Sequence, residues 1–192
     1  MFLYWNLAYP GMLFYAAVGL AVLAYTASLS LSYSVLPDFS VGRLKLRNLV
    51  DGWCELLKLI IPFIDPFKLR LPVWLALPAG LLLYAVGMAF TLLALRSLMP
   101  VLAARSRGQP HPKLLKTGVY SVVRHPLYFG STLWPAGLSI ALRAAASLAL
   151  TPVWLTYYTI IANIEEKQLT KEFGEEYEEY KRKVKKIIPL VY

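Results

Sequence analysis

The stretch PLYFGSTLWPAGLSIALRAAASLALTPVWLTYYTIIANIEE, residues 126–166, decides the fold class of this chain. Arg143 is its only charged side chain before the terminal Glu165-Glu166 pair. The arms on either side of that arginine, 126–142 and 146–164, are each close to the minimum of ~17 residues that a helix needs to cross a bilayer. We therefore predict a transmembrane helical hairpin whose two ends lie on one side of the membrane.

Other uncharged runs extend this class to the whole chain. Of the 192 residues, 58% are hydrophobic and 16% are charged, and residues 1–37 and 71–95 hold no charged side chain. Such runs have the length and composition of membrane spans. Disordered and collagen-like classes are excluded, and Cys54, the single cysteine, has no partner for an intrachain disulfide. The expected fold is an all-α, polytopic membrane protein, and the segment 11–36 is too long for a signal-peptide core.

The number of spans depends on residues 49–66, where Asp51, Glu55 and Lys58 form one polar stripe on an otherwise apolar helix. If this helix crosses, most basic loop residues share a side, which favours about five spans with a cytoplasmic C-terminus. If it lies flat, four spans result. The net charge of +9 suits anionic lipid headgroups, so the bilayer is the expected partner. No nucleic-acid module is visible in the sequence.

The composition changes sharply after Ile164, because residues 165–186 hold 7 acidic and 7 basic side chains. Apolar residues in this region recur at steps of three and four, which predicts one cytoplasmic amphipathic helix packed on the membrane domain or its interface. The residues of this apolar face are Leu169, Phe173, Tyr177, Tyr180, Val184 and Ile187.

Two polar clusters are expected at the same membrane face. One runs from His111 to Tyr128, where Pro126 suits the first turn of a helix whose free N–H groups can receive an anion. The other is Glu165-Glu166, which would suit a cationic group. Together they describe a receptor for a zwitterionic amino-acid group such as that of S-adenosylmethionine. Taken singly, each residue also fits an ordinary role, as an interfacial anchor or a solvated side chain.

The joint order of these residues is more specific. The chain contains, in this order, Gly118-x-Tyr120-x-x-x-Arg124-His125-Pro126-x-Tyr128-x-Gly130, an apolar hairpin, Glu165-Glu166, Phe173-Gly174 and finally Pro189. This order resembles the integral-membrane methyltransferase superfamily. The superfamily contains isoprenylcysteine carboxyl methyltransferases and phospholipid methyltransferases. The resemblance covers about the C-terminal 80 residues. It implies S-adenosylmethionine as cofactor, a lipophilic substrate entering from the bilayer, and a cofactor site made of Leu114, Leu115, Gly118, Tyr120, His125, Pro126, Tyr128, Glu165 and Glu166.

The resemblance also divides the chain into helices that shape lipid access, 1–100, and a methyltransferase core, 101–192. The chain has no Gly-x-Gly element of the phosphatidylethanolamine type, and the stretch 111–120 looks closer to the isoprenylcysteine branch and its prokaryotic relatives. We therefore expect O-methylation of an isoprenylcysteine-type carboxylate, with a phospholipid headgroup amine as the alternative acceptor. The ending Ile188-Pro-Leu-Val-Tyr192 also resembles that of membrane sterol reductases, so an NADPH-dependent reductase is the second hypothesis. A non-enzymatic membrane scaffold is the third.

Methyl transfer from a sulfonium needs alignment and exclusion of water more than acid-base chemistry. Two histidines and one cysteine make no plausible zinc site, so no metal is expected. A carboxylate acceptor would be held by a cation, Arg124 or Lys186, whereas an amine acceptor would need Glu165 or Glu166 as base. The active site is expected to face the cytoplasm, at the plasma membrane of a prokaryote or the endoplasmic reticulum of a eukaryote. The sequence leaves open the oligomeric state and which glutamate contacts the cofactor.

Overall fold

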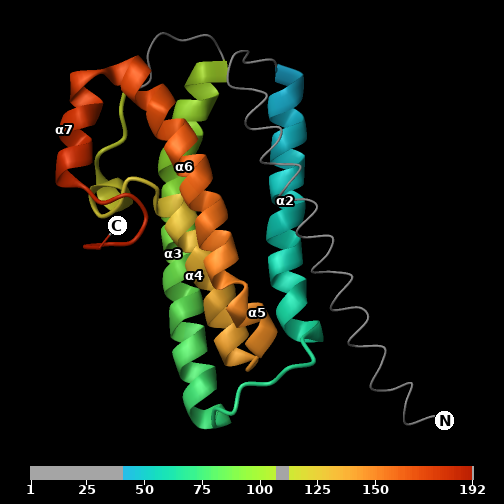
Figure 1. Ribbon diagram of the computed structural model, residues 1–192. Coiled ribbons are helices and arrows are strands. Elements are labelled where there is room, and N and C mark those ends of the chain that lie inside the picture. The colour runs from blue at the N-terminus through green and yellow to red at the C-terminus, as the bar shows by residue number, and fades with distance from the viewer. Residues whose placement is uncertain (1–40, 107–112, 192) are drawn as a thin grey trace. The chain divides into compact units, whose positions relative to one another are not determined.

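The computed structural model describes residues 41–106 and 113–191, and this part of the chain forms helices and no strand (Figure 1). The all-α class is therefore confirmed. The expected first span, 11–36, and His111 lie outside the described residues. The helices are α2 (Val41–Ile64), α3 (Val73–Ser106), the 3-10 helix η1 (Gly118–Ser121), α4 (Pro126–Ala141), α5 (Ala145–Ala149), α6 (Thr151–Phe173) and α7 (Glu175–Lys183).

Two stretches of the described chain, Val73–Val101 and Ala145–Phe173, are long and apolar enough to cross a membrane. In α3 many of the exposed side chains are large and apolar, as at Trp74, Leu82 and Leu92. A helix that is apolar all round suits a hydrocarbon environment better than water. The five-span topology stays a prediction, as does the crossing of residues 49–66, of which 49–64 lie in α2.

The chain divides into two compact units. The first unit contains Met1–Tyr84 and Pro135–Val153, and the second contains Ala85–Trp134 and Trp154–Tyr192. Helices α3, α4 and α6 each contribute residues to both units. The functional division into 1–100 and 101–192 stays a prediction.

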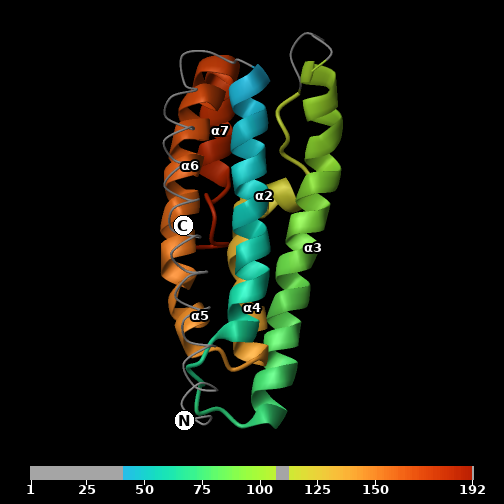
Figure 2. The ribbon, with the colours of Figure 1, turned by 90° about the vertical axis from the view of Figure 1, so that its right-hand side faces the viewer.

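In the first unit, the loop after α2 is tied to the connection between α4 and α5 (Figure 2). The carboxylate of Asp65, which is only 2% exposed, accepts hydrogen bonds from the backbone N–H of Phe67 at 2.9 Å and from the backbone N–H and hydroxyl of Ser147, both at 2.7 Å. The N–H of Leu69 donates to the carbonyl of Arg143 at 2.7 Å. Arg143 lies in the turn predicted for it, with a φ of +55°.

The second arm of the predicted hairpin is not one helix from 146. It begins as α5 and restarts as α6 at Thr151, because Pro152 has no N–H to continue a helical ladder and disfavours the helical conformation at the residue before it. The helix then continues beyond residue 164, so Glu165 and Glu166 lie inside α6 and not at its end.

Glycines bring α3 and α4 close together within each unit. A Cβ at Gly80 in the first unit would lie 2.3 Å from the backbone nitrogen of Ala141, and a Cβ at Gly87 in the second would lie 2.4 Å from that of Trp134. A Cβ at Gly130 would meet the Thr91 hydroxyl at 2.3 Å. Only glycine permits backbones to approach this closely, as at helix contacts in membranes.

The single amphipathic helix predicted for 165–186 is corrected. Helix α6 ends at Phe173, Gly174 has a φ of +55° that side chains with a Cβ rarely adopt, and α7 leaves in a new direction (Figure 1). The predicted apolar face is therefore divided between two helices. Tyr177 and Tyr180 of α7 are buried in the second unit.

Candidate functional site

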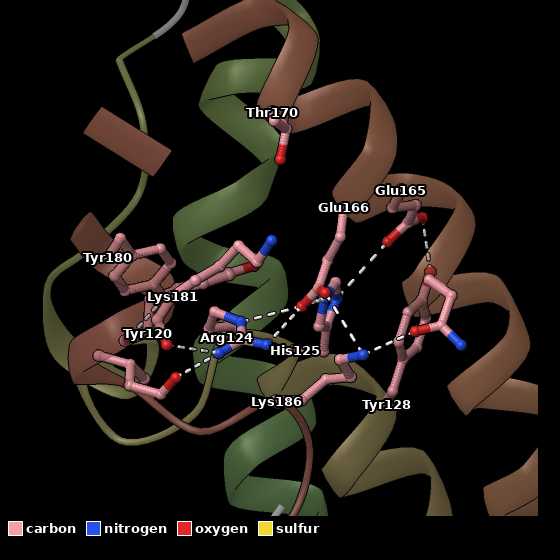
Figure 3. Close-up of polar contacts among 12 residues, drawn as sticks. Tyr120, Arg124, His125, Tyr128, Glu165, Glu166, Thr170, Tyr180, Lys181 and Lys186 are labelled. Carbon is pink, nitrogen blue, oxygen red and sulfur yellow. Dashed lines mark hydrogen bonds and ion pairs between the residues drawn. The ribbon is translucent and has the colours of Figure 1, made fainter. Parts of the chain in front are cut away.

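The second unit contains a buried carboxylate surrounded by basic side chains. Oε1 of Glu166 lies 2.9 Å from Nε and 2.8 Å from Nη2 of Arg124, and 3.3 Å from Nε2 of His125. Its other oxygen, Oε2, lies 3.3 Å from Nζ of Lys186. Figure 3 shows these three side chains gathered around Glu166. Burial of an ionised carboxylate is costly unless it is paired and hydrogen-bonded, and here both conditions are met.

The neighbouring carboxylate has a different environment. The side chain of Glu165 is 35% exposed, against 9% for Glu166. Its Oε1 accepts a 2.6 Å hydrogen bond from the hydroxyl of Tyr128, and its Oε2 lies 3.6 Å from Nδ1 of His125. The imidazole therefore lies between the two glutamates, and Glu165 is the one that a ligand can reach more easily.

The charge state of His125 follows from this position. Burial disfavours the imidazolium and lowers the pKa, but the hydrogen bonds and negative charges of Glu165 and Glu166 outweigh it. The net effect raises the pKa of His125 above its usual value. The site thus favours a protonated histidine between two carboxylates.

Arg124 connects Glu166 to the end of the chain. Its Nη1 donates to the carbonyl of Lys181 at 3.1 Å and to the carbonyl of Val184, which follows α7. These are carbonyls at a helix C-terminus, where a cation is favourable. The backbone N–H groups of Arg124 and His125 donate to the carbonyls of Lys185 and Lys186, at 2.8 and 2.9 Å. The Arg-His-Pro segment is thereby tied to the C-terminal segment by backbone and side chain alike.

Lys186, predicted from its place before the terminal Ile-Ile-Pro, does reach a carboxylate, that of Glu166. Its ammonium also donates to Oδ1 of Asn163 at 2.6 Å. Sequence reasoning assigned no role to Asn163, although it precedes Glu166 by three residues on a helix. Residues at that spacing lie on neighbouring positions of one face, which is the signal that could have found it.

The remaining predicted residues lie around this cluster. Pro126 begins α4 and is buried, and Gly118 begins η1 with a φ of +62°. Tyr120 is buried, and its carbonyl accepts a 2.5 Å hydrogen bond from the hydroxyl of Tyr180. Burial, together with the charge of Glu165, raises the pKa of Tyr120 to about 12, so its hydroxyl stays neutral. Leu114 and Leu115 are half-buried in the loop before η1 and take no part in the polar contacts described for Glu166.

Aromatic rings continue the site along α6. The rings of His125 and Tyr128 are stacked, with centroids 5.5 Å apart and an interplanar angle of 6°. Tyr128 is stacked in turn on Tyr158, at 5.0 Å and 16°. Tyr158 was missed by sequence reasoning, although it lies seven residues before Glu165, two turns away on the same face of the helix.

Among the described residues, no three histidine, cysteine, aspartate or glutamate side chains cluster so that they could hold a metal ion. The second unit brings together one histidine, two carboxylates and stacked aromatic rings, which come from segments far apart in the sequence. The molecule is thus a helical protein with membrane-length apolar helices and a charged, aromatic-lined cluster built by α4, α6 and the C-terminal segment.

The comparisons with known proteins place the chain in a family. The family model described as phospholipid methyltransferase matches residues 75–176, which is more than half of the chain. The chain belongs to this family.

Individual curated relatives share about a third of their residues with this chain over the aligned parts. A protein of rice (Oryza sativa subsp. indica) described as a probable protein-S-isoprenylcysteine O-methyltransferase is 32% identical over 123 residues, 62% of this chain and 63% of the relative. The protein-S-isoprenylcysteine O-methyltransferase of Saccharomyces cerevisiae is 30% identical over 142 residues, 72% of this chain and 59% of the relative. The methanethiol S-methyltransferase of Crocosphaera subtropica is 36% identical over 74 residues, 38% of this chain and 28% of the relative.

The chain thus spans less than two thirds of the length of these curated relatives. No solved structure matches it significantly.

Proposed function

We propose that the chain is an S-adenosylmethionine-dependent methyltransferase that acts on a lipid-borne acceptor within a membrane. The observation that carries this proposal is the partly exposed Glu165 carboxylate, which lies beside the stacked His125 and Tyr128 rings while Glu166 is held by Arg124, His125 and Lys186. The family and the names of the relatives support the reaction class.

The residues of the cluster fit the chemistry of this cofactor. Its ammonium group needs a reachable anion, for which Glu165 is better suited than the buried Glu166. Its carboxylate needs a positive partner, and α4, which begins at Pro126, would direct the positive end of its dipole toward such a group. Its adenosyl group needs flat apolar surfaces, which Tyr120 and the loop of Leu114 to Gly118 would supply. When bound, the cofactor supplies an electrophilic methyl group on a sulfonium.

The protein's own contribution is alignment and the placement of charge. The negative charge of Glu166 is offset by Arg124, His125 and Lys186. These contacts hold α6 against the start of α4 and the C-terminal segment. Arg124 is directed at Glu166 and at two carbonyls, and Lys186 at Glu166 and Asn163, so either cation would share its existing contacts with an acceptor carboxylate. An amine acceptor would instead need as its base the glutamate that the cofactor does not use, Glu166.

We propose an isoprenylcysteine-type carboxylate as the acceptor, which is supported by the names of the rice and yeast relatives. The family's description as phospholipid methyltransferase supports a headgroup amine as the alternative. We propose the lipid bilayer as the partner, and the predicted five-span topology would put the site at its cytoplasmic face. Within this proposal, residues 1–100 shape lipid access and residues 101–192 form the methyltransferase core.

The first test is the thermal stability of the detergent-purified protein with S-adenosylhomocysteine and, separately, with NADPH. A ligand that binds the folded state raises the unfolding temperature. We expect a rise with S-adenosylhomocysteine alone, its loss in Glu165→Gln, and its retention in Glu179→Gln, a matched change at an exposed glutamate of α7. A rise with NADPH alone would replace this function with a reductase, and an unchanged rise in Glu165→Gln would overturn the site.

The second test concerns the acceptor. Protein in liposomes is supplied with S-adenosylmethionine labelled on the methyl group and with either an N-acylated S-farnesylcysteine or phosphatidylethanolamine. We expect label in the farnesylcysteine ester, which is base-labile, and none in the phospholipid. Label in the phospholipid amine alone would overturn the carboxylate acceptor and leave the methyltransferase proposal standing.

A further inference from the structure

Tyr128 is held by α6 at two points. Its hydroxyl donates to Glu165 at 2.6 Å, and the face of its ring lies on Tyr158 with centroids 5.0 Å apart. Glu165 and Tyr158 are seven residues apart, so they project from the same face of one helix. Tyr128 of α4 therefore makes two contacts with one face of α6, one through its hydroxyl and one through its ring.

The two contacts differ in what a ligand would do to them. Glu165 is the carboxylate proposed to receive the cofactor's ammonium, so its bond to Tyr128 must be shared or given up when that ligand binds. Tyr158 is buried, 6% exposed, and its ring is supported at the edge by Tyr157, with centroids 5.2 Å apart and an interplanar angle of 74°. The ring contact is thus the one that persists.

We propose that Tyr158 is a positioning residue that holds the Tyr128 ring, and through it the His125 stack, in the orientation that receives the cofactor. This inference rests on the proposed function and deepens it. The role needs the aromatic face of Tyr158 and not its hydroxyl, since the contact to Tyr128 is a stack of nearly parallel rings. Tyr158 itself does not contact the cofactor in this proposal, and it acts on cofactor binding through Tyr128.

The test is the Kd for S-adenosylhomocysteine, measured on purified, folded protein by calorimetry. Stacked aromatic pairs contribute enough that Tyr158→Leu should raise the Kd about three- to tenfold. Tyr158→Phe should keep the Kd within about twofold of the original, because it retains the ring. The matched control is Phe90→Leu, which removes an aromatic pair with Phe129 (centroids 4.8 Å apart) in the same unit and should leave the Kd unchanged.

A double-mutant cycle separates positioning from general destabilisation. If Tyr158 acts through Tyr128, then Tyr158→Leu adds little to the Kd of a Tyr128→Leu protein, whereas independent effects would multiply. Multiplying effects, or an unchanged Kd in Tyr158→Leu, would overturn the inference. If Tyr158→Leu does not fold, Tyr158→Met, whose unbranched side chain is more adaptable, takes its place. Absence of binding by the unsubstituted protein would instead overturn the proposed function, so the two failures are distinguishable.

Discussion

Asp65 and Glu166 are both buried carboxylates, but the two units of the molecule satisfy them in different ways. Asp65 accepts from neutral donors, the N–H groups of Phe67 and Ser147 and the Ser147 hydroxyl. Glu166 is surrounded by the basic side chains of Arg124, His125 and Lys186. The neutral donors around Asp65 connect the loop after α2 to the short helix α5. Cations bring net charge into the interior, which suits a site for a charged ligand, and the next residue, Glu165, is left partly exposed.

The largest expected effect comes from breaking the cationic side of this comparison. Glu166→Ala leaves Arg124, whose side chain is 9% exposed, without its carboxylate, so the free energy of unfolding should fall by about 3–5 kcal/mol. Chemical denaturation in detergent, followed by tryptophan fluorescence, measures this change. Glu166→Gln, which keeps the shape and an acceptor oxygen, should lose less. Equal stability of Glu166→Ala and the unsubstituted protein would show that Arg124 finds solvent readily.

The Asp65 carboxylate, which is held by neutral donors, should matter less to stability and should not affect ligand binding. Asp65→Ala leaves the N–H and hydroxyl of Ser147 without their acceptor, and we expect a loss of about 2–3 kcal/mol. The same denaturation experiment gives this value, and Ser147→Ala, which removes only one of the three bonds, is the milder companion. The thermal shift with S-adenosylhomocysteine should persist in folded Asp65→Ala. Loss of that shift without loss of stability would contradict the division of roles.

A smaller effect is expected in the pH dependence of stability, because His125 lies against Glu166 whereas Asp65 is held by neutral donors. The folded-state pKa of His125 is raised above the unfolded value of about 6.5, so its stabilising contribution is complete below about pH 6.5 and is lost as the pH rises through the folded-state pKa. Unfolding temperatures between pH 6 and 9 should therefore fall with rising pH. His125→Gln should flatten this part of the profile. His111→Gln, which removes the only other histidine, is the control, and an identical slope in His125→Gln would refute the assignment.

The smallest effect is expected at a surface ion pair of the second unit. Lys116 and Glu176 lie 2.6 Å apart, but their side chains are 43% and 51% exposed. Lys116→Met should change the free energy of unfolding by less than about 1 kcal/mol, because solvent screens the pair. High salt should remove even that difference. A loss comparable to that of Glu166→Ala would mean that this contact holds the loop before η1 in place.

Several parts of the fold followed from local patterns. The uncharged run 71–95 predicted most of α3, and Arg143 predicted the turn of the hairpin. The positions of Pro126 and of the apolar stripe on 165–186 also agree with helices in those places. What the stripe could not show was the break, because the repeat of threes and fours continues across Gly174 and only the backbone conformation there ends α6.

The site was predictable by residue type but not by arrangement. The Arg-His-Pro segment and the Glu-Glu pair are visible as motifs, and the structure brings Arg124, His125, Tyr128, Glu165, Glu166 and Lys186 together. The bonds of Arg124 to the carbonyls of Lys181 and Val184 could not be foreseen, since a backbone carbonyl has the same chemistry at every residue. Tyr158 was also missed, because its spacing of seven residues from Glu165 indicates a shared helix face but does not show that its ring contacts Tyr128.

By itself, the sequence determined the helical class, the membrane-length apolar segments and the pairing of a histidine motif with two adjacent glutamates. It could not determine which glutamate is buried, because Glu165 and Glu166 are chemically identical neighbours. Only the tertiary structure decided this. Successive residues on a helix point about 100° apart, so one carboxylate turns toward Arg124 and Lys186, which lie 42 residues before it and 20 residues after it. The other turns toward Tyr128, where its side chain stays partly open to a ligand.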